Sequence, residues 1–108
     1  MTQVEGPNSS PINPSDKLRY EKEYLQSVDL FQRALNEYNK TDDMYKKEAF
    51  KEVMDKAMQV LNETARELKR TDLVAQNQKI SQSYEELQEQ KADAVVVSKN
   101  LNQAKKTV

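Results

Sequence analysis

The chain has 108 residues, including 17 Lys and Arg and 18 Asp and Glu, and it has no Cys and no His. Its length predicts a single domain, and its near-neutral charge argues against nucleic acid or an acidic membrane as a partner. The lack of Cys excludes disulfides and thiolate metal sites. The lack of His removes the commonest general base and the commonest metal ligand, so we expect no enzyme and no cofactor.

Composition predicts an all-α protein. Apolar residues make up 36% of the chain, and no run of them approaches the length of a membrane span. No signal-peptide pattern is present, so we expect a cytoplasmic protein, with secretion by a specialised system as the alternative. The one Gly and all three Pro precede Ser15, which leaves a long stretch rich in good helix formers.

Residues 1–14 differ in kind from the rest of the chain. They hold the Gly, the three Pro and several Ser and Asn, with few large apolar side chains. Such a segment buries too little surface to offset the entropy lost on ordering, so we predict a disordered leader before one helical domain over residues 15–108. An export signal or a docking tail would have the same composition.

Two helices follow the leader, over about residues 14–39 and 42–70. Asn13 is a good N-cap for the first and Pro14 suits its first turn, whereas Thr41 and Asp42 cap the second. Their apolar stripes step by three and four residues, as a helix face requires. The stripes are Tyr24, Val28, Phe31, Leu35 and Tyr38 in the first helix, and Phe50, Met54, Ala57, Leu61, Thr64 and Leu68 in the second.

A third helix is predicted over about residues 72–106. Its heptad row is apolar (Leu73, Ile80, Leu87, Ala94, Leu101, Val108), but the companion row is mostly polar (Asn77, Tyr84, Lys91, Ser98, Lys105). This helix would overhang the other two by a turn or two. The link at Arg70–Asp72 has neither Gly nor Pro, so one continuous helix from Asp42 onward is an alternative.

These patterns predict an antiparallel three-helix bundle of long, coiled-coil-like helices. A helical hairpin that completes its core as a dimer is the alternative, because the third helix offers little apolar surface. The five Tyr outnumber the two Phe. Tyr24, Tyr38 and Tyr84 fit the edge of the core. Tyr20 and Tyr45 lie near helix starts. Each either packs its ring over the helix end or serves as an aromatic anchor of a protein interface.

The segment from Ala92 to Val97 is the one anomaly, since apolar or small residues lie nearly all round the helix there. It either closes the end of the bundle or forms a patch for a partner. The candidate interface comprises Val95, Val96, Val97, Leu101, Ala104 and Val108. On this reading, Leu101→Asp should abolish partner binding while leaving helicity largely intact.

We therefore predict a non-enzymatic protein–protein interaction module that acts by packing helix against helix. It would be a small adaptor, a chaperone-like protein or an assembly subunit. The partner would be another protein or a second copy, with a homodimer favoured. The alternative is an exported helical protein whose N-terminus is the secretion signal. No Gly-rich phosphate loop or calcium loop exists, since the only Gly is Gly6.

Overall fold

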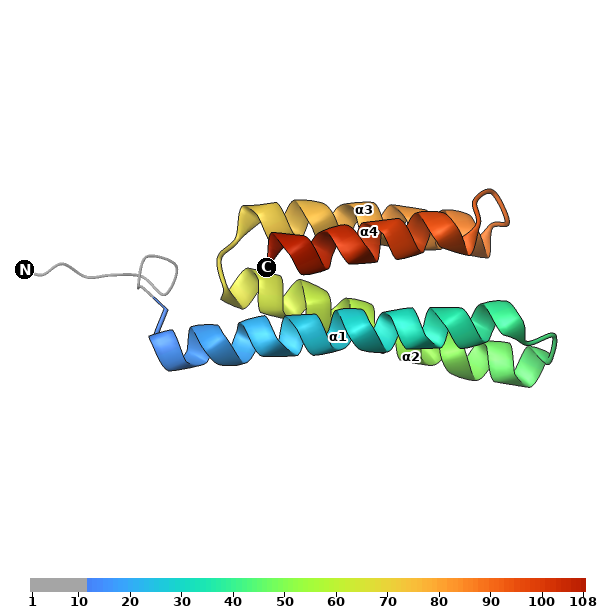
Figure 1. Ribbon diagram of the computed structural model, residues 1–108, viewed down its shortest axis with the longest axis horizontal. Coiled ribbons are helices and arrows are strands. Elements are labelled where there is room, and N and C mark those ends of the chain that lie inside the picture. Colours follow the sequence, from blue (N-terminus) through green and yellow to red (C-terminus); the bar gives the residue numbers. More distant parts are fainter. Residues whose placement is uncertain (1–11) are drawn as a thin grey trace, which may run out of the picture.

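A computed structural model describes residues 12–108, which form four α-helices (Figure 1). They are α1 (Pro14–Lys40), α2 (Met44–Glu67), α3 (Thr71–Gln88) and α4 (Ala94–Thr107), and no strand occurs within this range. The predicted all-α class is confirmed. The predicted three-helix bundle is wrong, because the helix expected over 72–106 is two helices.

The four helices form an up-down-up-down bundle. Each runs antiparallel to the one before it, and α1 packs against both α2 and α4, while α3 packs against the same two helices (Figure 1). α1 has 27 residues and α2 has 24, against 18 in α3 and 14 in α4. The predicted overhang of a third helix is therefore wrong. The chain folds back at that point, and the α1–α2 hairpin is the longer half of the bundle.

The first two helix starts are fixed by side-chain caps. Asn13 Oδ1 accepts a hydrogen bond from the Ser15 N–H at 2.8 Å, and Pro14 occupies the first turn, as the sequence predicts. Asp43 caps α2, its Oδ1 accepting from the Tyr45 N–H at 2.8 Å. This start lies two residues later than predicted.

Residues 89–93 divide the predicted third helix. Gln90 takes a left-handed conformation with φ of 62°, and its N–H donates to the carbonyl of Leu87 at 3.1 Å. The N–H of Lys91 donates to the carbonyl of Glu86 at 2.8 Å, which completes a Schellman motif. Asp93 then caps α4, its Oδ1 accepting from Val95 N–H at 3.1 Å.

The turn between α2 and α3 has the same geometry. Lys69 has φ of 56°, and its N–H donates to the Arg66 carbonyl at 3.0 Å, while the Arg70 N–H reaches the Ala65 carbonyl at 3.2 Å. The alternative of one continuous helix from Asp42 onward is therefore wrong. A residue with a Cβ in this conformation costs about 1–2 kcal/mol, so each of the two turns retains some backbone strain.

The core runs along the axis of the bundle and is closed within one chain. Phe31 and Tyr84 meet edge to face in it, with ring centroids 5.2 Å apart and planes at 77°. The predicted stripes of the first two helices lie in this core, with Tyr38 and Phe50 half-buried. The other large buried side chains are Tyr24, Val28, Leu35, Met54, Leu61, Leu73, Ile80, Val97 and Leu101.

A polar layer crosses this core. The Tyr24 hydroxyl donates to Asn77 Oδ1 at 2.6 Å, and Asn77 Nδ2 donates to the Leu61 carbonyl at 2.9 Å, so α1, α3 and α2 are joined by one amide. Asn77 is only 1% exposed. Burial raises the pKa of Tyr24, so its hydroxyl stays protonated and donates.

Candidate functional site

The six residues of the predicted interface separate into two groups. Val97, Leu101 and Ala104 are fully buried in the core of the chain itself, and Val108 packs half-buried against it. These four follow the three- and four-residue steps of one helix face, and α4 turns that face toward α1 and α3. These four residues therefore close the bundle, which is the alternative to a partner patch that the sequence analysis offered for this segment.

The burial of Leu101 changes the expected effect of its substitution. An Asp at this fully buried position would place a charge in the core. We therefore expect Leu101→Asp to unfold the chain, and the prediction of intact helicity does not fit the structure.

Val95 and Val96 are the members of the predicted set that face solvent, at 63% and 42% exposure. They lie in the first turn of α4, which the Asp93 cap fixes in place. Met44 and Tyr45 occupy the first turn of α2 and are exposed by 77% and 89%. Both helices begin at the same end of the bundle (Figure 1). We name these four residues the apolar end surface.

The first turn of α2 is held against the end of α1. Lys47 Nζ lies 4.6 Å from the centroid of the Tyr38 ring, a cation–π contact between the two helices. Tyr38 in turn packs half-buried against the core. Tyr45, however, points into solvent, so it does not act as a staple over the helix start. Its aromatic ring is presented on a well-anchored helical turn.

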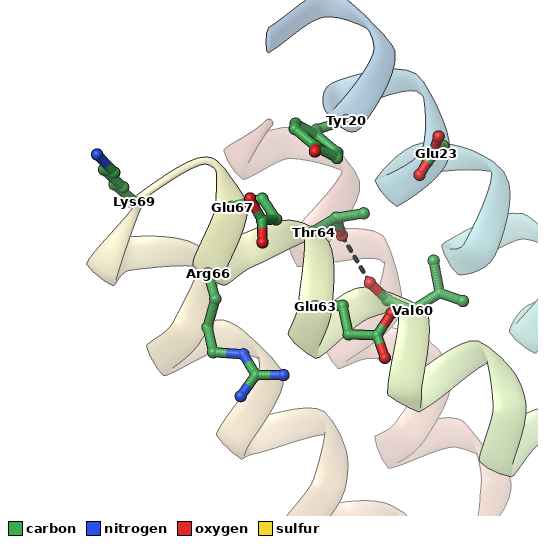
Figure 2. Close-up of a pocket in the computed structure, with 8 residues that line it drawn as sticks. All are labelled: Tyr20, Glu23, Val60, Glu63, Thr64, Arg66, Glu67 and Lys69. Carbon is green, nitrogen blue, oxygen red and sulfur yellow. Dashed lines mark hydrogen bonds between the residues drawn. The ribbon is translucent and has the colours of Figure 1, made fainter. Parts of the chain in front are cut away.

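A groove of about 700 Å³ lies between the start of α1 and the end of α2 (Figure 2). Tyr20, Glu23, Val60, Glu63, Thr64, Arg66, Glu67 and Lys69 line it. The only buried hydroxyl among these, that of Thr64, donates to the Val60 carbonyl at 2.8 Å within its own helix. The Tyr20 ring is covered by Arg19, whose Cζ lies 4.8 Å from the ring centroid. The groove therefore presents mixed charge around a short apolar floor, with no nucleophile held by a base.

The strongest ion pair lies at the other end of the bundle from the apolar end surface. Arg70 donates from Nε and Nη2 to the two carboxylate oxygens of Asp72, and Nη2 also donates to the Thr107 carbonyl at 2.9 Å. The hydrogen bonds from Arg70 hold the pKa of Asp72 below its ordinary value of 3.8. This network joins the α2–α3 turn to the end of α4, so its role is structural.

A second tyrosine is perturbed at the edge of the core. The Tyr84 hydroxyl donates to Asp55 Oδ1 at 2.8 Å. Burial, reinforced by the neighbouring carboxylate, raises the pKa of Tyr84. The contact joins α3 to α2, so it too serves the packing of the bundle.

Residues 12–108 offer neither a cluster that could hold a metal ion nor a helix that could span a membrane. No cluster of three or more acidic side chains there is arranged to hold a metal ion. None of the described helices combines the length and the hydrophobicity needed to cross a membrane. The predicted leader falls mainly on residues 1–11, which lie outside the described range.

Comparison with known proteins gives no relative for this chain. It matches no protein-family model, and no curated protein or solved structure resembles it significantly.

Proposed function

We propose that this chain is a non-enzymatic interaction module that binds another protein through the apolar end surface. The observation that carries the proposal is the exposure of four large apolar side chains in the first turns of α2 and α4, led by Tyr45 at 89%. The predicted stripes lie in the core, whereas three further large apolar side chains, Leu18, Leu25 and Leu30, are exposed along α1. Large apolar side chains left exposed on two helix starts at the same end are a feature of protein contact sites.

The residue types support a contact of this kind. Tyr and Met are enriched in protein interfaces, because Tyr combines a large apolar ring with a polar tip and Met adapts its shape to the partner. Both belong to the α2 start, whereas Val95 and Val96 add rigid branched side chains from the α4 start. Because α2 and α4 do not contact each other, a partner must span the end of the bundle to reach both pairs of side chains.

The size of the surface sets the expected affinity. Full burial of one such side chain contributes about 1.5–3 kcal/mol, and a large part of the total offsets the freedom lost on association. Four side chains therefore suit a reversible complex better than an obligate one. Loss of a single anchor should then be measurable as a change in the dissociation constant.

Site-specific photocrosslinking tests the position of the surface. A photoreactive amino acid is introduced at Tyr45 or at Val95 and, as a matched control, at Leu18, which is also exposed but lies near the start of α1 at the opposite end (Figure 1). We expect the same protein to be captured from positions 45 and 95 and not from position 18. Equal capture from position 18 would count against the surface.

Titration with the purified, captured protein then tests its energetics. Met44→Glu and Val95→Glu each place a charge on the proposed contact, and we expect each to weaken binding by about tenfold or more, which corresponds to 1.4 kcal/mol. Leu18→Glu is the control and should leave the affinity unchanged. Both positions of the test pair are exposed, so circular dichroism should show an intact fold. Unchanged affinity in both variants would overturn the proposal.

A further inference from the structure

The turn Leu68–Arg70 is the only covalent link between two helical hairpins. It joins the hairpin of α1 and α2 to the hairpin of α3 and α4. Lys69 in this turn is left-handed, with φ of 56°, although it is not a glycine. A short connection under strain favours exchange of a structural element between identical chains.

We propose that this chain forms a dimer by exchanging its α3–α4 hairpin, with Leu68–Arg70 opening so that α2 and α3 join into one helix. The partner is a second copy of the same chain. The contact is the interface between the two hairpins, and the apolar end surface takes no part in it. This inference therefore stands independently of the function proposed above.

The sequence of the turn favours an open, helical form. Neither Gly nor Pro occurs between Ala65 and Leu73, so nothing in this segment breaks a helix. Opening also returns Lys69 to the right-handed region and removes its strain. The ion pair of Arg70 with Asp72 opposes opening, because residues two apart do not face each other on a helix and the pair belongs to the closed turn.

The interface between the hairpins fits only a hairpin of the same kind. Asn77 must meet both the Tyr24 hydroxyl and the Leu61 carbonyl, and Tyr84 must meet Phe31 edge to face. An opened chain exposes these buried groups, and a second copy offers every donor, acceptor and ring at the required place. Because the contacts between the hairpins are re-formed between chains, exchange costs little energy at this interface and is favoured by high protein concentration.

Crosslinking across the hairpin interface distinguishes exchange from ordinary dimerisation. The chain has no Cys, so Gln32→Cys with Asn102→Cys creates one pair, at side chains that touch at 2.6 Å between α1 and α4. The protein is concentrated, its monomer and dimer are separated by size, and each is treated with a short bis-maleimide. On a denaturing gel we expect the dimer fraction to run as a covalent dimer and the monomer fraction as a monomer.

A second Cys pair serves as the matched control. Tyr38→Cys with Lys47→Cys lies within the α1–α2 hairpin, where Lys47 Nζ is 4.6 Å from the Tyr38 ring. This pair should link within one chain in both fractions. Intrachain linkage of the Gln32 and Asn102 positions in the dimer would overturn the exchange, as would a chain that stays monomeric at every concentration.

Substitution in the two strained turns identifies the hinge. Lys69→Gly relieves the strain of the closed turn and weakens the continuous helix, so we expect the dissociation constant of the dimer to rise by about tenfold or more. Lys69→Ala removes the same side chain but keeps the strain, and should not weaken the dimer. Gln90→Gly makes the equivalent change inside the exchanged hairpin and should have no effect. A dimer weakened by Gln90→Gly and not by Lys69→Gly would show that α4 alone is exchanged.

Discussion

The polar layer in the core offers a quantitative test of how the helices are held in register. Asn77→Leu keeps the number of side-chain heavy atoms and their branched shape but removes both hydrogen bonds of Asn77, to the Tyr24 hydroxyl and to the Leu61 carbonyl. Leu61 still has its own helical hydrogen bond and accepts from Thr64 at 3.2 Å. The group left without a partner is therefore the Tyr24 hydroxyl, in a side chain that is fully buried.

The expected loss of stability follows from the one buried group that loses its hydrogen-bond partner, the Tyr24 hydroxyl. A buried hydroxyl without a hydrogen bond costs about 1–3 kcal/mol, so we expect Asn77→Leu to lower the free energy of unfolding by about 2 kcal/mol. Tyr24→Phe should lower it by about 1 kcal/mol, because one hydrogen bond is lost and Asn77 keeps its other one. The double variant removes donor and acceptor together, so its stability should lie within about 1 kcal/mol of the original chain.

Urea denaturation followed by circular dichroism measures all four proteins of this cycle. The coupling between Tyr24 and Asn77 should reach about 2 kcal/mol, well above the 0.3–0.5 kcal/mol expected of independent sites. The slope of the unfolding free energy against urea should stay constant, since the surface exposed on unfolding changes little. Strictly additive effects would refute the reasoning, because they would mean that the hydrogen bond contributes nothing beyond the two separate side chains.

Three further effects are expected. Leu101→Ala removes a fully buried side chain and should lower the free energy of unfolding by about 2–5 kcal/mol in urea titrations, whereas a loss below about 1 kcal/mol would contradict its place in the core. Gln90→Gly should raise the melting temperature, since Gly adopts φ of 62° without strain and about 0.5–1 kcal/mol is gained, and a fall would argue against a left-handed turn there. Asp72 has a pKa lowered by Arg70, so its contribution is present above pH 3.8 and is lost as the pH falls through the lowered pKa. In the Asp72→Asn variant, the free energy of unfolding should fall less steeply as the pH is lowered through the acid range. The same pH dependence in the variant and the original chain would contradict the ion pair.

Much of the first two helices could be predicted from periodicity alone. Tyr24, Val28, Phe31 and Leu35 repeat at the spacing of a helix face, and no other structure buries such a set on one side. Asn13 followed by Pro14 marks the start of α1, because the cap and the fixed φ of proline act locally. These features depend on nearest neighbours, which is why the sequence reveals them.

The division of the third helix could not be predicted in the same way. Gln90 ends α3 in a left-handed conformation that Gly normally provides, and tertiary packing of the short α4 is what compensates for the strain. One local signal was present, since Asp93 is a good N-cap directly before the apolar run from Ala94. The change in apolar register after Ala94 marks the same boundary.

Part of the candidate interface was assigned wrongly because the turn between α3 and α4 was not predicted. If the helix overhung the bundle, the valine-rich segment would be exposed to solvent all round. Once α4 folds back, Val97 and Leu101 face the core and only Val95 and Val96 remain outside. The polar companion row was misleading for a related reason. Asn77 and Tyr84 are buried because hydrogen bonds from other helices satisfy them, and no single-helix pattern shows such partners.

The order of the helices around the bundle also governs how the chain folds. Three of the four packed pairs join helices that follow one another in sequence, and only the pair of α1 with α4 brings distant segments together. The loops of three to five residues close quickly, and bundles with mostly local contacts fold in about microseconds to milliseconds. We therefore expect the contacts within each hairpin to form before α1 meets α4.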